Sequence, residues 1–266
     1  MSTNLSTLRL STDGMSKGAS GDDVRAMQSY LRHYGYIQDA IGICRDGDFD
    51  AETERALCLY QNCMGLPETG RLDEATLCEM GKPRCGVPDI APLAAPFTTV
   101  SRWDKLDLTY AFDTFSSKLA QSDIERDTRR AFALWAAHCA LTFEPAAQGG
   151  AVDIAIAFAT GAHGDGAPFD GASGVLAHAY FPPPNGGPLA GDTHFDDDER
   201  WTCAMTDAEG IDYLTVAAHE FGHAIGLSHS RRRAALMFPS YSGPHRYLDQ
   251  DDIAGCQSLY GAPLTR

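Results

Sequence analysis

Two things are scarce in this sequence: long hydrophobic runs and positive charge. None of its 266 residues lies in a window that approaches the roughly 20 consecutive apolar residues of a membrane span. Lys and Arg number 21 against 36 Asp and Glu, and the formal net charge is -15. Because such a chain repels anions, we expect no nucleic-acid partner and no contact with an anionic membrane surface. Its excess of carboxylates favours divalent cations as ligands.

The sequence also lacks a secretory signal and closely spaced cysteine pairs. Residues 1–19 are polar and rich in Ser, Thr and Gly, without the charged start and apolar stretch of a signal peptide. We therefore expect a flexible start, with the export signal missing from this chain or replaced by another route. No two of the eight cysteines have C-x-x-C spacing, so most are expected to be buried or bridged structural residues whose pairing stays open.

The sequence contains enough apolar residues for a sizeable core, 44% of the total, and its patterning predicts two domains. Residues 20–82 hold three segments with helical periodicity: SGDDVRAMQSYLRHYGY, DAETERALCLYQNCMG and LDEATLCEMG. Residues 83–96 follow, and from residue 86 onward they contain prolines at 88, 92 and 96, which disfavour helix and predict an extended linker.

Residues 97–266 have the pattern of an α+β domain. LDLTYAF and VDIAIAF alternate as strands, and SDIERDTRRAFALWAAHC is an amphipathic helix. Residues 160–198 are different, because they are rich in loop-forming Gly, Pro and Asp and contain three histidines. A long loop inside a compact domain is usually either disordered or held by something other than a core, and the histidines and acids here indicate metal ions.

The segment with the clearest chemistry is VAAHEFGHAIGLSHS, residues 216–230. His219 and His223 are four residues apart, so on a helix they project from one face toward a single cation. A glycine then permits a turn, and His229 can return as a third nitrogen ligand of zinc. The fourth tetrahedral position is open to water. Glu220 is placed to accept the proton of that water and to pass it to the leaving amine of a peptide.

The extended pattern H-E-x-x-H-x-x-G-x-x-H, followed by Met237 in a turn, resembles the catalytic domain of the matrixins, the matrix metalloproteinase branch of the metzincins. Ser230, the turn ALMFPSY and the closing LDQDDIAGCQSLYG also match, so the resemblance covers about residues 97 to 262. It implies a twisted, mostly parallel five-stranded sheet with three helices. It also implies a secreted, monomeric zinc metalloendopeptidase that hydrolyses proteins or peptides, including extracellular matrix.

Residues 20–82 resemble a peptidoglycan-binding-like domain, and the PRCGVPD that follows resembles the cysteine switch of matrixin zymogens. In that family a thiolate occupies the fourth zinc position, so Cys85 would exclude the nucleophilic water. Arg84 and Asp89 would pair to hold the loop. A structural disulfide is the alternative for Cys85. A different class of function is also open: a cell-wall-associated protein that binds peptidoglycan through residues 20–82.

The resemblance implies further metal sites, for two zinc and one to three calcium ions in total. A structural zinc would be held by three nitrogens and one carboxylate, from His163, Asp165, His178 and His194. A first calcium would take oxygens from Asp170, Gly171, Ser173, Val175, Asp196 and Glu199. A second would take them from Asp153, Pro188, Ala190 and Asp192, although the family usually has glycine at the two middle positions. A third would use Asp123, Asp197 and Glu199, for which a solvated acidic face is the alternative.

The resemblance also places the substrate. The substrate strand would lie antiparallel to an edge strand near residues 175–180. Pro239 and Tyr241 would form a wall of the pocket for the residue after the scissile bond, and Thr215 is small at the family's pocket-depth position. A medium to large apolar residue such as Leu is therefore expected there.

Activation would remove residues up to about Ala95 or Pro96. The new amine of Phe97 would then pair with Asp251 or Asp252, as in the family.

Overall fold

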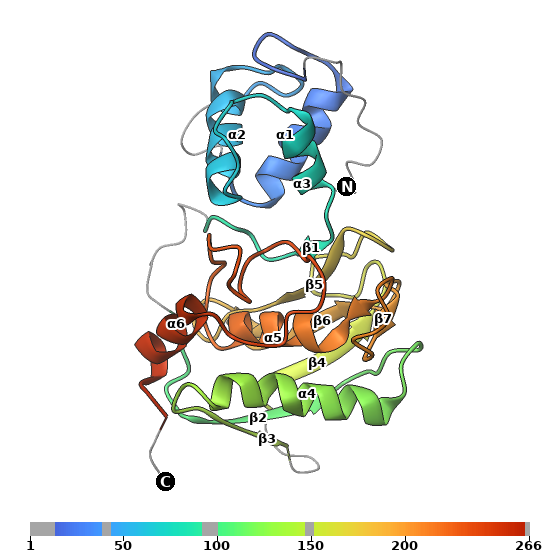
Figure 1. Cartoon of the computed structure of the whole chain (residues 1–266), viewed down its shortest axis with the longest axis vertical. Helices are drawn as coiled ribbons and strands as arrows, with labels where there is room; N and C mark the ends of the chain where they lie inside the picture. The colour runs from blue at the N-terminus through green and yellow to red at the C-terminus, as the bar shows by residue number, and fades with distance from the viewer. Residues whose placement is uncertain (1–13, 39–43, 92–100, 147–151, 264–266) are drawn as a thin grey trace. The chain divides into compact units, whose positions relative to one another are not determined.

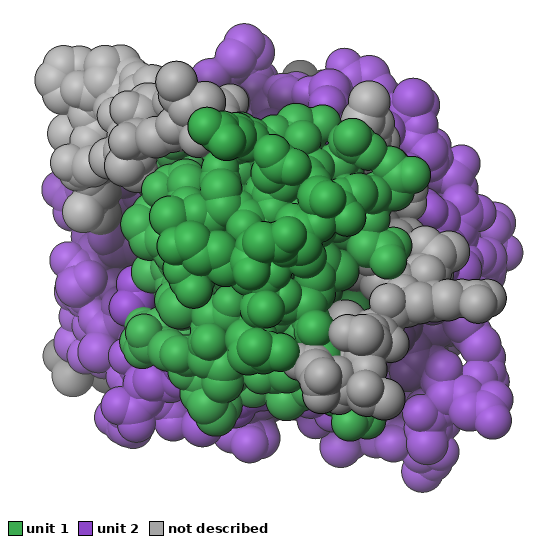
Figure 2. Space-filling view, turned by 90° about the horizontal axis from the view of Figure 1, so that it is seen from above, with its two compact units in different colours: residues 1–82, 87–98 green, residues 83–86, 99–266 purple. Residues whose placement is uncertain are grey.

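The computed structural model describes residues 14–38, 44–91, 101–146 and 152–263. The chain forms two compact units, residues 1–82 with 87–98 and residues 83–86 with 99–266 (Figure 2). The segment 83–86 therefore belongs structurally to the second unit, although its neighbours on both sides belong to the first. The start of the expected flexible stretch, residues 1–13, and the end of the expected linker, residues 92–96, lie outside the described residues.

The first unit contains the three expected helices, which are α1 (Asp22–His33), α2 (Ala51–Cys63) and α3 (Glu74–Met80) (Figure 1). Side-chain caps begin two of these helices. Asp50 accepts the amide of Thr53 at the start of α2, and Asp73 accepts the amide of Thr76 at the start of α3, each over 2.9 Å. The helical expectation for residues 20–82 is thus confirmed.

Two buried glutamines hold the loops of the first unit in the same way. Gln28 of α1 accepts the amide of Gly47 over 2.8 Å and donates to the threonine in the first turn of α2. Gln61 of α2 accepts the amide of Gly70 over 3.0 Å and donates to the threonine in the first turn of α3. Each glutamine therefore satisfies the buried backbone of the loop that follows its own helix.

The second unit is built on a sheet of six strands in the order β1-β5-β6-β4-β2-β3 (Figure 1). The strands are β1 (Arg84–Cys85), β2 (Asp107–Phe112), β3 (Thr142–Pro145), β4 (Ile154–Ala159), β5 (Val175–Ala179) and β6 (Thr193–Asp196). All neighbours pair in parallel except β5 and β6. The expected α+β class with a mostly parallel sheet is confirmed. Five strands come from the catalytic-domain sequence, and the segment 83–86 adds a sixth at the edge.

The other elements of the second unit are its three helices and three short pieces. The helices are α4 (Gln121–Ala136), α5 (Tyr213–Ala224) and α6 (Gln250–Tyr260), and the short pieces are β7 (Trp201–Thr202), β8 (Ile211–Asp212) and the 3-10 turn η1 (Gly187–Leu189). β7 pairs with β8 apart from the main sheet. Among the described residues, no helix combines the length and apolarity needed to cross a bilayer.

Helices α4 and α5 pack together in the core of the second unit. The ring of Phe132 on α4 stacks on Phe221 of α5 with 4.0 Å between centroids. The indole of Trp135 donates to the carbonyl of Ala218 over 2.9 Å. Every residue of α5 is buried, including those that face away from α4. The side chains of α5 are therefore held rigidly and shielded from bulk water.

The histidine-rich stretch 160–198 contains more regular structure than its composition predicts. Strands β5 and β6 both lie in it and pair so that His178 stands opposite His194. Composition alone misses both strands, although the family resemblance placed one near residues 175–180. The polar cross-strand pair and the surrounding Gly and Pro hide their short apolar runs. The stretch is held partly by sheet hydrogen bonds and partly by the polar clusters described below.

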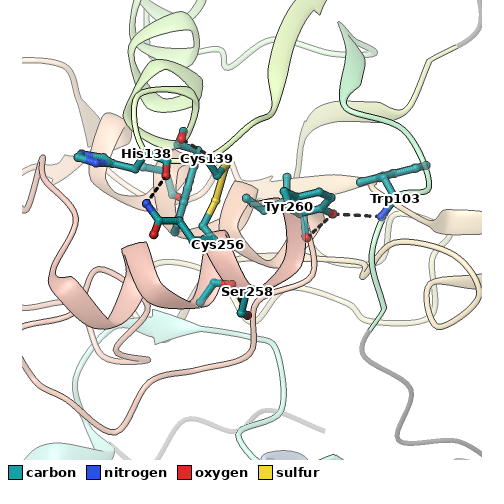
Figure 3. The surroundings of a disulfide bond; sticks show 11 residues. Trp103, His138, Cys139, Cys256, Ser258 and Tyr260 are labelled. Atoms are coloured by element: carbon teal, nitrogen blue, oxygen red, sulfur yellow. Dashed lines mark hydrogen bonds between the residues drawn. A yellow bond between two sulfur atoms is a disulfide. The ribbon is translucent and has the colours of Figure 1, made fainter. Parts of the chain in front are cut away.

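A disulfide joins Cys139, just after α4, to Cys256 in α6 (Figure 3). Both residues are buried, and 117 positions separate them in the sequence. The contact is reinforced on each side. Gln257 donates to the carbonyl of His138 over 2.9 Å, and the hydroxyl of Tyr260 accepts the amide of Trp103 over 3.0 Å (Figure 3). Helix α6 is therefore covalently tied to the core, a pairing that the sequence left open.

Replacing both Cys139 and Cys256 with serine should lower the free energy of unfolding of the second unit by about 2–4 kcal/mol, because a long loop would no longer be closed in the unfolded chain. Denaturant titration of the wild type and the double variant measures this. Cys78→Ser, at an exposed position in the first unit, is the matched control. Equal stability of the double variant and the wild type would contradict the prediction.

Candidate metal centres

Helix α5 carries the first two predicted zinc ligands. His219 and His223 lie one helical turn apart, and their ring centroids are separated by 5.0 Å. The helix begins at Asp212, whose side chain accepts the amide of Thr215 over 3.1 Å. The exposed fractions of the two histidines are 7% and 0%. The cap and the surrounding core thus fix the direction of both rings.

A tight turn brings the third predicted ligand back to the helix. Gly226 has a φ of +105°, and a Cβ at this position would lie 2.1 Å from the carbonyl oxygen of Ser101. Only glycine fits there. After this turn, Nε2 of His229 lies 3.1 Å from Nε2 of His223. The H-x-x-G-x-x-H spacing therefore works because the glycine reverses the chain where a side chain would collide.

Backbone carbonyls orient two of the three rings. Nδ1 of His219 lies 2.7 Å from the carbonyl oxygen of Leu236, and Nδ1 of His223 lies 2.7 Å from that of Leu227. Because a carbonyl only accepts, each Nδ1 carries the proton, which leaves Nε2 with the lone pair that a metal needs. Burial and the two neighbouring imidazoles also lower the pKa of His223 well below its ordinary value, so its ring is neutral.

Cys85 brings a thiol to the same point. Its Sγ and one nitrogen from each of His219, His223 and His229 all lie within 4.8 Å of one another. Zinc bonds of about 2.0–2.3 Å place tetrahedral ligand atoms roughly 3.3–3.8 Å apart. Nitrogen and sulfur are the donors that zinc favours. The four residues therefore fit a zinc ion in both chemistry and spacing.

Glu220 lies beside this cluster and is fully buried. Its Oε2 accepts a hydrogen bond from the thiol of Cys85 over 3.5 Å, and its Oε1 has no hydrogen-bond partner among the described residues. Burial raises the pKa of Glu220 to about 8, against a smaller lowering by the bond from Cys85. A buried carboxyl with one oxygen unpaired is suited to receive and release a proton.

The segment 83–86 crosses the site as a strand. On one side the amide of Gly86 donates to the carbonyl of Ala177 in β5 over 2.8 Å. On the other side the amide of Cys85 donates to the carbonyl of Pro239 over 3.0 Å. β1 runs parallel to β5. Backbone hydrogen bonds on both edges therefore hold Cys85 in place.

The predicted methionine turn lies directly under the histidine helix. Met237 is buried, and a Cβ added to Gly222 of α5 would lie 2.3 Å from its sulfur. The carboxylate of Asp252 accepts the amides of Leu236 and Met237 over 2.7 and 3.0 Å. Asp252 was expected only as a partner for a new N-terminal amine. Its position in the first turn of α6 shows that it anchors the turn, which sequence spacing alone does not reveal.

The four residues predicted for a structural zinc form a second cluster. Oδ2 of Asp165 lies 2.8 Å from Nε2 of His163, 2.7 Å from Nε2 of His178 and 2.8 Å from Nδ1 of His194. The four ligand atoms lie within 4.8 Å of one another. Burial lowers the pKa of His178 to about 4, so its ring is neutral and able to coordinate a metal. Three nitrogens and a carboxylate oxygen at this spacing fit a closed zinc site.

The acids predicted for the first calcium site surround the loop 170–175. Asp170 accepts the amide of Val175 over 3.0 Å, and Glu199 accepts that of Ser173 over 2.7 Å. Asp196 is fully buried, and its Oδ2 has no partner among the described residues. Burial, with the charges of neighbouring carboxylates, raises the pKa of Asp196 to about 6 and that of Glu199 to about 7. An unpaired buried oxygen among acids fits a hard cation.

The loop itself curls sharply around these acids. Gly171 and Gly174 have φ angles of +85° and +133°, and Ser173 has +69°. Ser173 is the one non-glycine residue with positive φ in the described part of the chain. A Cβ on Gly174 would lie 2.4 Å from Oδ2 of Asp170. Strain of this kind persists only where the surroundings impose it.

The residues predicted for a second calcium ion are placed differently. The carboxylate of Asp153 accepts the amide of Thr109 over 2.7 Å and pairs with the ammonium of Lys105 over 2.8 Å. Pro188 lies in η1, and Ala190 follows it. Burial raises the pKa of Asp192. The side chain of Asp153 is thus already neutralised by a lysine that sequence analysis did not single out.

The acids predicted for a third calcium ion also have protein partners. Asp123 pairs with Arg126 one turn further along α4. Asp197 accepts the amide of Ser117 over 3.0 Å. Lys118 donates to the carbonyl of Glu199 over 3.1 Å. A cationic side chain therefore pairs with the carboxylate of Asp123, whereas Lys118 bonds to the backbone of Glu199, an acid that is also predicted for the first site.

A cavity of about 340 Å³ opens beside Glu220 and is lined by the predicted pocket residues Thr215, Pro239 and Tyr241. The hydroxyl of Thr215 donates to Asp212 over 2.6 Å, and the hydroxyl of Tyr241 accepts the amide of Asp212 over 2.9 Å. The N-cap residue of α5 therefore also braces the walls of the cavity.

Of the residues predicted to act in activation, Ala95, Pro96 and Phe97 lie outside the described residues. Asp251 accepts the hydroxyl of Ser230 over 2.5 Å.

Comparison with known families agrees with this geometry. Residues 102–261 match the family model described as "Matrixin", and residues 20–80 match that of a "Putative peptidoglycan binding domain".

Individual relatives extend the likeness over most of the chain. Stromelysin-1 of Equus caballus is 46% identical over 207 residues, which is 76% of this chain and 42% of the relative. Matrix metalloproteinase-25 of Homo sapiens is 40% identical, covering 92% of this chain and 46% of the relative. The hatching enzyme of Paracentrotus lividus is 40% identical over 92% of this chain and 40% of its own length. The chain spans about half or less of the length of these relatives. Because the matrixin model covers more than half of its residues, the chain belongs to the matrixin family.

Proposed function

We propose that this chain is a latent zinc-dependent endopeptidase that is blocked by its own segment 83–86. One observation carries the proposal: the thiol of Cys85 and nitrogens of three histidines converge within 4.8 Å of one another. They do so beside Glu220, whose free oxygen is buried. In this reading His219, His223 and His229 hold the metal in every state, and Cys85 holds it only in the latent state.

The chemistry of the active state would be divided between the metal and the chain. A zinc ion in this site would polarise the scissile carbonyl and lower the pKa of a bound water. Glu220 accepts the proton of the attacking water and transfers it to the leaving amine. The carbonyls of Leu236 and Leu227 keep two imidazoles in the coordinating tautomer throughout. Burial of the whole of α5 limits movement of these groups.

The direction of β1 supports two parts of the proposal: the path of the substrate strand along β5, and the latency of the uncut chain. A substrate strand is expected to run antiparallel to β5, between β5 and the segment Pro239–Tyr241. The segment 83–86 lies in that position, hydrogen-bonded to both edges, but runs parallel to β5. Its peptide bonds are therefore presented to Glu220 in reverse. A blocking strand of this kind would fill the site without being cut.

We also propose that the enzyme acts on proteins outside the cell, where a disulfide is stable. The buried Cys139–Cys256 bond supports this placement, since such bonds persist in oxidising compartments.

For the calcium ions we propose one site rather than three. Support comes from the unpaired buried oxygen of Asp196. By contrast, Asp153 of the second site pairs with Lys105 and Asp123 of the third pairs with Arg126. An ammonium or guanidinium beside a carboxylate supplies the charge that calcium would otherwise bring.

Glu220→Gln should abolish peptide hydrolysis, with a loss of about a hundredfold or more, because the amide cannot accept the proton. The substitution is nearly isosteric, so zinc content measured by plasma emission should stay equal to that of the wild type. The assay is cleavage of a quenched fluorescent peptide with Leu after the scissile bond, by activated protein. Undiminished turnover with zinc retained would refute the proposed mechanism.

Cys85→Ser should raise the activity of the uncut chain at least tenfold, because a hydroxyl is a much poorer zinc ligand than a thiolate. Initial rates on the same peptide measure this, and N-terminal sequencing detects self-cleavage. Cys203→Ser, at a partly buried thiol outside the site, is the control and should stay latent. A Cys85→Ser chain as inactive as the wild type would show that latency has another cause.

The calcium proposal predicts one tightly held calcium per chain after stripping and reloading, measured by emission spectroscopy on gel-filtered protein. Asp196→Asn should remove it, because the unpaired oxygen becomes a poorer ligand. Asp123→Asn should leave the count unchanged, because that carboxylate pairs with Arg126. Two or three retained calcium ions in the wild type would overturn the proposal.

A further inference from the structure

One wall of the cavity beside Glu220 is a segment without helix or strand. Residues 242–245 all line the cavity. Within the described part of the chain, residues 242–247 form no backbone-to-backbone hydrogen bond. A segment of this kind depends on side-chain contacts for its position. Those contacts therefore decide the shape of the cavity.

One such contact is a buried ion pair between Arg246 and Asp212, the residue at which α5 begins. Nε of the arginine lies 3.0 Å from Oδ2 of the aspartate, and Nη2 contacts Oδ1. Nη2 also donates to the carbonyl of Cys203 over 3.0 Å. The exposed fractions of the arginine and aspartate side chains are 12% and 0%. Because two bonds fix the plane of the guanidinium, the ion pair sets the direction of the segment as well as its distance from α5.

Asp212 connects this ion pair to three residues that line the cavity. Its Oδ2 accepts the amide and the hydroxyl of Thr215 over 3.1 and 2.6 Å. The amide of His245 donates to that hydroxyl over 2.8 Å. The hydroxyl of Tyr241 accepts the amide of Asp212 over 2.9 Å. All three therefore take their positions from one residue, whose charge Arg246 neutralises.

The other charged groups near this point have contacts of their own. Asp127 acts electrostatically on Arg246, but its carboxylate pairs with two arginines of α4, each over 2.9 Å. Arg233 lines the cavity, and its guanidinium lies over the ring of Phe238, 5.0 Å from the centroid. Among the described residues, Arg246 is thus the one cation in contact with Asp212. Because its removal would leave a buried carboxylate unpaired, the ion pair stays closed in the folded protein.

We propose that Arg246 is a positioning residue, which acts through Asp212 to fix the wall 242–245 and thereby sets how strictly the cavity selects the substrate side chain after the scissile bond. The inference rests on the proposed peptidase function and refines its specificity. Against a fixed wall, a side chain too short to fill the cavity loses contacts that leucine makes. A wall released from Asp212 can repack around shorter side chains, so the difference in binding between leucine and alanine becomes smaller.

The test compares two peptides that differ only after the scissile bond, with leucine or with alanine. The zinc-loaded full chain, activated with an organomercurial, is assayed as wild type and as the double variant Asp212→Asn/Arg246→Met. Because both charges are removed together, no buried carboxylate is left unpaired, and asparagine can still cap α5. The ratio of kcat/KM for leucine over alanine should fall about tenfold in the double variant, which is the contribution of one methylene group in an apolar pocket.

That ratio separates positioning from stability, because a smaller folded fraction lowers both rates by the same factor. Arg232→Met is the matched control and should keep the wild-type ratio. It removes an exposed guanidinium that lies 3.5 Å from Asp249 and does not line the cavity. Arg246→Lys keeps the charge without the bidentate geometry, so its ratio should lie between those of the wild type and the double variant.

A double variant with the wild-type ratio would overturn the proposal, and so would an equal fall in Arg232→Met. If the double variant does not fold, Arg246→Lys decides, and a ratio equal to that of the wild type would then overturn it. The wild type separates the two levels of inference. If it cuts neither peptide, the proposed peptidase function fails, whereas cutting both at equal rates refutes only the role of Arg246.

Discussion

The site depends above all on two hydrogen bonds between imidazoles and backbone carbonyls. They join Nδ1 of His219 to Leu236 and Nδ1 of His223 to Leu227, and they decide which nitrogen of each ring faces the centre. The carbonyl of Leu236 is itself placed by the methionine turn, whose amides Asp252 holds from α6. Helix α6 is tied to the end of α4 by the disulfide. A chain of contacts thus runs from a covalent bond to the orientation of a proposed zinc ligand.

The acidic side chains of the second unit fall into two groups, according to what neutralises their charge. Some have a cation from the chain itself, as Asp153 has in Lys105 and Asp212 has in Arg246. Others, such as Asp196, are buried with an oxygen unpaired and a raised pKa. The second kind is unfavourable without an external cation. The net charge of the sequence does not separate the two kinds, because it counts paired and unpaired carboxylates alike.

Sequence spacing predicts what lies within one element or one turn. The pairing of His219 with His223, the return of His229 after Gly226, and the amphipathic α4 all follow from local periodicity and from a glycine with positive φ. Contacts between distant segments do not follow from spacing. The Cys139–Cys256 bond, the anchoring role of Asp252 and the added strand β1 join residues far apart in the chain, and no local pattern encodes which partner each meets. The family resemblance supplied the cluster around Asp165 and the meeting of Cys85 with the three histidines, because it carries such tertiary information.

Two kinds of contact hold the segment 83–86. Its backbone is hydrogen-bonded to the sheet, and the thiol of Cys85 is hydrogen-bonded to Glu220. Cys85 is only 5% exposed. Its own amide is bonded to the segment that follows the methionine turn, and the amide of Gly86 is bonded to β5. A thiol reagent can therefore reach Cys85 only after the strand has lost its hydrogen bonds on both edges. In the proposed latent state, the onset of activity is governed by a local unfolding equilibrium, and a change that weakens those edge bonds would speed activation without altering the sulfur.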